Sequence, residues 1–143
     1  MITAIIAVTG AGSAVSTTDT AYGYITTEVD AQTELRLAGE DTEQIVRTYF
    51  RDIPVMIQVA RCESTFRHTL EDGTVLKGRV DPRDTGVMQI NKGYHEATAT
   101  KMGLDLDDIY DNMEYARYLY DTQGTQPWSA SSPCWGQTLA YNG

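Results

Sequence analysis

The chain has 143 residues, which is enough to bury one hydrophobic core and too few for two full domains. Its composition, 41% hydrophobic and 22% charged, is close to the globular average and excludes a repeat array or a disordered polymer. Eleven basic and twenty acidic residues give a formal net charge of -9, which disfavours nucleic acid as a partner because phosphate binding needs a cationic face.

The N-terminal segment is first apolar and then polar. Residues 2–15 resemble the apolar stretch and cleavage zone of an export signal, although no Lys or Arg precedes them. Residues 16–31 are rich in Thr, Ser, Asp and Gly without a period, as in a linker. We therefore predict an export-like segment and linker over residues 1–30, with membrane attachment as one of its possible uses, and a folded domain over residues 31–143.

The first helix of that domain is predicted over residues 41–51. Asp41 or Thr42 is a suitable N-cap for it, because a short polar side chain there can bond the free backbone N–H groups. The apolar residues that recur on one face of the helix are Ile45, Val46, Tyr49 and Phe50.

A second helix is predicted over residues 53–64. Asp52 is expected to be its N-cap, and Pro54 lies in its first turn, where a missing N–H costs nothing. The apolar residues of this segment follow a three- and four-residue rhythm, so one side of the helix should be buried. Glu63 then falls at the end of a buried helix, at the edge of the core.

The rest of the chain mixes a little sheet with more helix. A small β-hairpin is predicted over residues 69–80, where Glu71-Asp72-Gly73 supplies a turn. A short apolar run follows at 86–91, and further helices are predicted over 96–102 and 112–120. The fold class is therefore α+β, predominantly α, with the hairpin between the helix that ends at Glu63 and the later helices.

Glu63 is the candidate catalytic residue. A carboxyl group at an apolar helix end can keep its proton near neutral pH, because desolvation disfavours the charged form. Such an acid can protonate the leaving oxygen of a glycosidic bond. Taken alone, the dipeptide Glu63-Ser64 fits a solvated Glu at a helix end better than a catalytic acid. The neighbouring sequence motifs therefore decide between these two interpretations.

Two motifs bear on this choice. Residues 60–66 read ARCESTF and residues 86–91 read GVMQIN. Together they resemble the soluble lytic transglycosylases, relatives of goose-type lysozyme, whose signature is an ES dipeptide followed by G-(Leu/Val)-Met-Gln-Ile. The resemblance covers residues 45–135. It implies a lysozyme-like fold and cleavage of the β-1,4 bond between MurNAc and GlcNAc in peptidoglycan, with Glu63 as general acid and base.

A second likeness concerns the cysteines. Cys62-Glu63, Pro127-Trp128 and Cys134-Trp135 resemble the resuscitation-promoting factors and related small secreted muralytic domains. In those proteins a Cys just before the catalytic Glu is bridged to a Cys in a C-terminal Trp-rich segment. The resemblance implies a Cys62–Cys134 disulfide and an extracytoplasmic location, secreted, periplasmic or at the cell envelope. Counting cysteines alone leaves two free thiols equally open.

The resemblance also implies residues that bind the glycan. Ser64 matches the residue that assists sugar binding beside the catalytic Glu, with a hydroxyl that bonds the helix backbone as the equal alternative. Gln89 matches a cleft-lining amide, and Trp128 could stack on a sugar unless it is simply buried. The candidate substrate-binding residues are Ser64, Gln89, Asn91, Tyr94, Tyr118 and Trp128.

The sequence departs from the family at a tyrosine that supports the catalytic carboxyl. The family carries it in an Ala-Tyr-Asn-Ala-Gly motif on a later helix, whereas the similar Ala140-Tyr141-Asn142-Gly143 lies here at the very terminus. We treat that match as chance and take Tyr118 as the substitute.

A single catalytic carboxylate, Glu63, is enough to cleave the bond if the C6 hydroxyl of muramic acid is the nucleophile. That reaction gives a 1,6-anhydro product and needs no metal or cofactor. The rivals are a hydrolase of the same bond, with a water activated by Asp81 or Asp84, and a non-catalytic wall-binding module. A redox role for Cys62 is weakened by the lack of a CxxC motif.

The protein is expected to be a monomer, and its expected partner is the peptidoglycan glycan strand. This strand is anionic, so binding should depend on hydrogen bonds and stacking rather than on charge.

Overall fold

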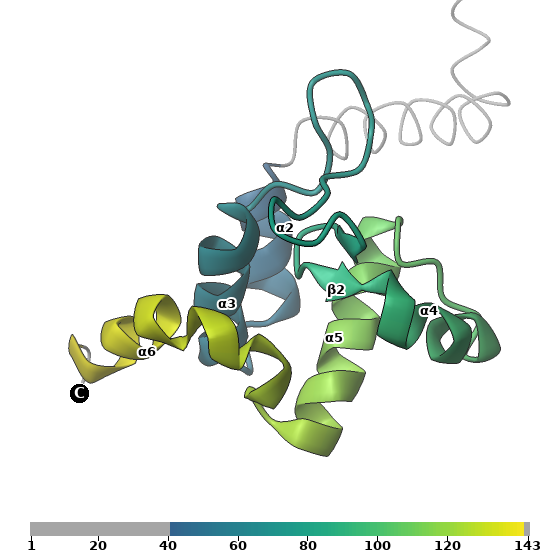
Figure 1. Cartoon of the computed structure of the whole chain (residues 1–143). Helices are drawn as coiled ribbons and strands as arrows, with labels where there is room; N and C mark the ends of the chain where they lie inside the picture. The colour runs from purple at the N-terminus through teal and green to yellow at the C-terminus, as the bar shows by residue number, and fades with distance from the viewer. Residues whose placement is uncertain (1–40, 142–143) are drawn as a thin grey trace, which may run out of the picture. The chain divides into compact units, whose positions relative to one another are not determined.

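The structure, a computed structural model, describes residues 41–141, with side chains as far as Gln137. The predicted segment 1–30 and its boundary with the domain 31–143 lie outside these residues. Helices dominate and one two-stranded antiparallel sheet accompanies them, which confirms the α+β, mainly α class. In chain order the elements are α2 (Thr42–Tyr49), α3 (Pro54–Ser64), β1 (Asp84–Thr85), β2 (Ile90–Asn91), α4 (Lys92–Lys101), α5 (Ile109–Gln123), the 3-10 helix η1 (Gln126–Ser131) and α6 (Ser132–Tyr141) (Figure 1).

The first two helices form where the sequence predicts them, with one correction at a cap. The Asp41 side chain accepts a hydrogen bond from the backbone of Glu43 at 3.3 Å and caps α2. The residue at the N-cap of α3 is Ile53, so the prediction of Asp52 at that place is wrong. The Asp52 carboxylate instead accepts two hydrogen bonds from the Arg117 guanidinium of α5, at 2.8 and 2.9 Å. A bidentate charged partner is stronger than a backbone N–H, which accounts for the difference.

The hairpin predicted over 69–80 forms in its first part only. The bridge Thr69↔Val75 and the hydrogen bonds from Leu70 N–H to Thr74 O and from Leu76 N–H to His68 O, both 2.8 Å, close it, and Asp72 Oδ1 holds the turn by accepting from both the N–H and the hydroxyl of Thr74. Beyond Leu76 the chain pairs forward with β1, through the bridge Lys77↔Thr85. The sheet is therefore made by β1 and β2, which run antiparallel.

The later helices begin earlier than predicted. α4 begins at Lys92 instead of residue 96, and α5 covers 109–123 instead of 112–120, because the Asp108 side chain caps it by accepting from the N–H groups of Tyr110 and Asp111. Neither η1 nor α6 was predicted. α6 packs against α3, as Figure 1 shows at the yellow end of the chain.

The core lies between α3, α5 and η1. The buried side chains of α5 include Met113, Tyr115 and Leu119, and Trp128 of η1 is 3% exposed. α3 contributes the fully buried Met56 and other apolar residues of the same face. This packing fixes the end of α3, where Glu63 lies. Within residues 41–141 no helix has both the length and the apolar character needed to cross a bilayer.

Candidate active site

Glu63 lies in the last turn of α3 and is half-buried. The helix ends directly after it, with Thr65 and Phe66 both in the left-handed region at φ 56° and 57°. This conformation is rare for residues other than glycine and is strained for a β-branched residue such as Thr65. Ser64 stabilises the end locally, because its buried hydroxyl donates to Ala60 O at 3.0 Å.

The disulfide between Cys62 and Cys134 is present, which confirms that prediction. It joins residues 72 positions apart, with a Cα–Cα distance of 6.0 Å, and ties α6 to the end of α3. Both cysteines of the chain are used in it, so no thiol remains for the redox role considered for Cys62. A structural disulfide is typical of proteins outside the cytoplasm.

Ser131 is the side chain that contacts the Glu63 carboxyl. Its hydroxyl lies 2.6 Å from Glu63 Oε1 and 3.1 Å from the carbonyl oxygen of Trp128. A hydroxyl has one hydrogen to donate and can also accept. It can therefore donate to Glu63 when the carboxyl is ionised, and can accept from Glu63 and donate to Trp128 O when the carboxyl is protonated. Ser131 was not among the predicted residues.

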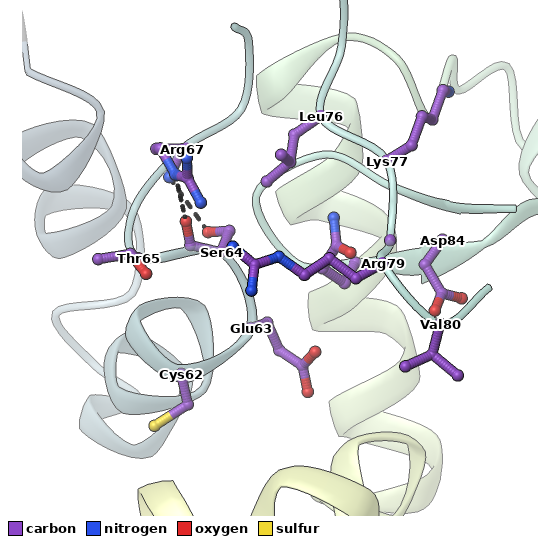
Figure 2. Close-up of a pocket in the computed structure, with 12 residues that line it drawn as sticks. Cys62, Glu63, Ser64, Thr65, Arg67, Leu76, Lys77, Arg79, Val80 and Asp84 are labelled. Atoms are coloured by element: carbon purple, nitrogen blue, oxygen red, sulfur yellow. Dashed lines mark hydrogen bonds between the residues drawn. The ribbon is translucent and has the colours of Figure 1, made fainter. Parts of the chain in front are cut away.

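The surroundings raise the pKa of Glu63 above its ordinary value. Burial is the largest cause, and the negative charge of Asp84 adds to it, whereas the hydrogen bond from Ser131 opposes both. Figure 2 shows the carboxyl groups of Glu63 and Asp84 facing the same pocket from different segments. Asp81 is occupied elsewhere, because Arg83 donates to both its oxygens and holds its pKa below the usual range.

The segment 86–91 forms the opposite wall. Gln89 has φ 51° and donates from Nε2 to Gly86 O at 2.8 Å, so its amide is held at the pocket by a strained backbone. Met88 is fully buried, and its carbonyl oxygen accepts from Trp128 Nε1 at 2.9 Å. Gly86 cannot be replaced easily, since a Cβ there would come 2.6 Å from the Asn112 amide.

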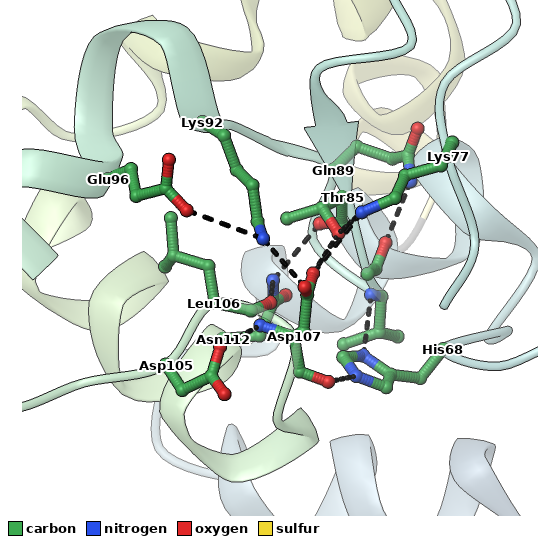
Figure 3. Close-up of polar contacts among 12 residues, drawn as sticks. His68, Lys77, Thr85, Gln89, Lys92, Glu96, Asp105, Leu106, Asp107 and Asn112 are labelled. Carbon is green, nitrogen blue, oxygen red and sulfur yellow. Dashed lines mark hydrogen bonds and ion pairs between the residues drawn. The ribbon is translucent and has the colours of Figure 1, made fainter. Parts of the chain in front are cut away.

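A polar network fixes this wall from behind (Figure 3). His68 is buried, accepts from Val87 N–H through Nδ1 at 3.1 Å, and therefore carries its hydrogen on Nε2, which donates to Asp107 O at 2.8 Å. The Asp107 carboxylate accepts from Lys92 Nζ at 2.6 Å and from Thr85 Oγ1 at 2.7 Å. These bonds join segments distant in the sequence into one rigid support.

Two pockets meet at Glu63, Asp84 and Gln89, which line both. The first, of about 380 Å³, also contains Arg67 and Arg79, and we call it the arginine pocket. The second, of about 330 Å³, also contains Trp128 and other aromatic or amide side chains, and we call it the tryptophan pocket. A long ligand lying in both pockets would pass Glu63.

The predicted binding residues are only partly brought together. Gln89, Asn91 and Tyr94 line the tryptophan pocket, and Tyr94 is 75% exposed. Trp128 also lines it, but as a buried wall whose N–H is already bonded to Met88 O.

Two further predicted residues lie less favourably for a glycan contact. The Ser64 hydroxyl is buried and its one hydrogen is used within the helix, so it fits the local role considered for it. The Tyr118 ring packs on that of Tyr115, with centroids 5.5 Å apart, and lines neither of the two pockets at Glu63.

No group of three or more His, Cys, Asp or Glu side chains in the part of the chain that the structure describes could hold a metal ion.

The chain was also compared with known proteins. No protein-family model, curated protein or solved structure matches it.

Proposed function

We propose that this protein is a peptidoglycan lytic transglycosylase with a lysozyme-like fold, which cleaves the β-1,4 bond between MurNAc and GlcNAc. The observation that carries the proposal is a half-buried carboxyl, Glu63, with a raised pKa at the junction of two pockets. A general acid works best with a pKa near the working pH, and the surroundings of Glu63 shift its pKa in that direction.

The shape and chemistry of the site suit a glycan. A polymer lying along both pockets would bring one glycosidic bond to Glu63 and leave residues on either side of it bound. The side chains available include amides at Gln89 and Gln123, which can bond hydroxyl and acetamido groups, and the exposed ring of Tyr94, on which a sugar can stack. The Asn91 amide is used within the protein, because it donates to Asp81 and Asp84.

The reaction needs only one carboxyl group from the protein. Glu63 gives its proton to the glycosidic oxygen as the bond from that oxygen to C1 of MurNAc breaks. The Glu63 carboxylate then takes the proton from the C6 hydroxyl of the same sugar, whose oxygen bonds to C1. The product is 1,6-anhydroMurNAc, and no water is consumed. Ser131 stabilises the carboxylate between the two steps by donating its hydrogen to Oε1.

Asp84 supports a second candidate function, a muramidase that hydrolyses the same bond. Hydrolysis with two carboxyl groups needs a second carboxylate near the acid. Asp84 lines both pockets and acts electrostatically on Glu63, whereas Asp81 is bonded to Arg83. The non-catalytic alternative is a wall-binding module of the same fold.

Digestion of purified sacculi, followed by mass spectrometry of the released muropeptides, tests the proposal. We expect the wild-type protein to release fragments with 1,6-anhydro ends and Glu63→Gln to lower the rate by about 10² to 10⁴-fold, the usual contribution of a general acid-base group. Reducing ends that disappear in Asp84→Asn would support the muramidase instead. Sacculi left intact by wild-type protein would contradict both enzymes and favour the binding module.

The proposed substrate also defines the proposed setting. The glycan strand lies outside the cytoplasm, so the protein would be secreted, periplasmic or attached to the cell envelope, in keeping with its disulfide. We propose that it acts as a monomer and without a cofactor.

A further inference from the structure

The arginine pocket contains two guanidinium groups that have no carboxylate partner among residues 41–137. Elsewhere Arg47, Arg83 and Arg117 each pair with a carboxylate at 2.6 to 2.8 Å. Arg67 and Arg79 form no ion pair with any residue between 41 and 137, although both line this pocket. In a chain of formal charge -9, acidic partners are plentiful, so two unpaired arginines in one pocket call for an explanation.

Arg67 and Arg79 are both exposed residues that line the pocket, and the backbone or side chain next to each is held by hydrogen bonds. Arg67 donates from Nε to Ser64 O at 3.1 Å, which fixes its stem at the end of α3 and leaves its two terminal nitrogens open. Arg79 follows Gly78, whose N–H donates to Asp84 O at 2.9 Å, so the residue is anchored next to β1. Figure 2 shows its side chain extending across the pocket toward Ser64.

The third cation of this pocket is already engaged. Lys77 Nζ donates to Thr85 Oγ1 at 2.9 Å and contacts Asp107 Oδ1 at 3.3 Å. The tryptophan pocket contains no Lys or Arg, and burial lowers the pKa of His95, so that ring stays neutral at neutral pH. Of these two pockets, the arginine pocket is therefore the one in which described Lys or Arg side chains lack an acidic partner.

We propose that the arginine pocket binds a carboxylate carried by the substituent on C3 of muramic acid, while the tryptophan pocket takes the uncharged part of the strand. This inference rests on the proposed function. Guanidinium groups bind carboxylates through paired N–H donors, which makes Arg67 and Arg79 suitable for it. The carboxylate is either that of the lactyl group, on strands without peptide, or that of an acidic residue in the attached peptide.

The test measures affinity and does not depend on catalysis. Arg67→Gln, Arg79→Gln and the double variant are made in the Glu63→Gln background, and binding is measured by calorimetry. The ligands are soluble glycan fragments with peptides, the same fragments after amidase removal of the peptides, and a neutral chitooligosaccharide. Arg51→Gln is the matched control, because Arg51 is exposed and lines neither pocket at Glu63.

Each substitution should raise the Kd for the carboxylate-bearing fragments about tenfold, as expected for loss of one charge-assisted hydrogen bond. The Kd for chitooligosaccharide should stay unchanged, as should every Kd of the control. A loss limited to peptide-bearing fragments assigns the site to the peptide, and a loss with both fragments assigns it to the lactyl group. An unchanged Kd in the double variant, or an equal loss for the neutral ligand, would overturn the inference. Failure of the proposed function would appear separately, as intact sacculi.

Discussion

The acidity of Glu63 is set by burial and by two polar neighbours, and these three effects do not all act in the same direction. Burial and the charge of Asp84 raise its pKa, and the hydrogen bond from Ser131 lowers it. Because Glu63 must be protonated to begin the proposed reaction, activity should fall as pH rises through this pKa. This fall is the alkaline limb of the pH–activity profile, and the pH at which it lies depends on the effect of each neighbour on the pKa of Glu63.

Substitution of the two polar neighbours should move the limb in opposite directions. Ser131→Ala removes a donor to the carboxylate, so the pKa of Glu63 and the alkaline limb should rise. Asp84→Asn removes a negative charge, so both should fall. The measurement is kcat/KM against pH for muropeptide release by each variant.

Asp81→Asn is the matched control, because it makes the same change at a carboxylate that is bonded to Arg83 and is not among the causes of the Glu63 shift. Shifts of equal sign in Ser131→Ala and Asp84→Asn would contradict the described electrostatics.

At this scale the sequence predicts some residues of the site well. Glu63 and Gln89 were found because each belongs to a motif, and both line the junction of the pockets. Ser131 was missed because the stretch from Ser129 to Ser132 offers several hydroxyls. The signal that could have selected it is the predicted disulfide: Ser131 precedes Cys134 by about one helical turn, which brings it to Cys62 and hence to Glu63.

At the scale of elements, the arrangement of α3, η1 and α6 makes the site. α6 packs on α3 and on η1, and η1 carries Ser131 to Glu63. The disulfide between α3 and α6 reinforces this arrangement covalently.

Removal of the disulfide should therefore destabilise the protein strongly. A cross-link that closes a loop of 72 residues stabilises the folded state by about 4 kcal/mol in the chain-entropy model. We expect the double variant Cys62→Ser, Cys134→Ser to lose that much free energy of unfolding, measured by urea denaturation. Wild-type protein under reducing conditions is the control and should match the variant. A loss below about 1 kcal/mol would mean that noncovalent packing alone holds α6 to α3.

Helices were predicted better than the sheet. The period of apolar residues fixes α2 and α3, because each buries one face against the core. The turn of the hairpin was predicted because it is local, whereas β1 and β2 were not, because the choice of partner strand depends on tertiary contacts such as Gly78 N–H to Asp84 O. η1 and α6 carry no comparable period, and the cysteine in α6 was the only guide to their place.

At the scale of the whole molecule, net charge and local charge give different expectations. The formal charge of -9 suggests that attraction to an anionic wall has no part in binding. The arrangement of Arg67 and Arg79 gathers positive charge at one end of the site in spite of it. A total taken over the sequence does not reveal which charges are neutralised by neighbours and which remain free.

Titration of the Glu63 carboxyl carbon by carbon-13 NMR, with the signal assigned by its loss in Glu63→Gln, tests whether this residue can serve as the acid. A half-buried carboxyl beside Asp84 should titrate with a midpoint above the ordinary value of 4.5. A midpoint at or below that value would mean that burial and the charge of Asp84 do not favour the protonated form of Glu63, and it would contradict the role of this residue as the acid.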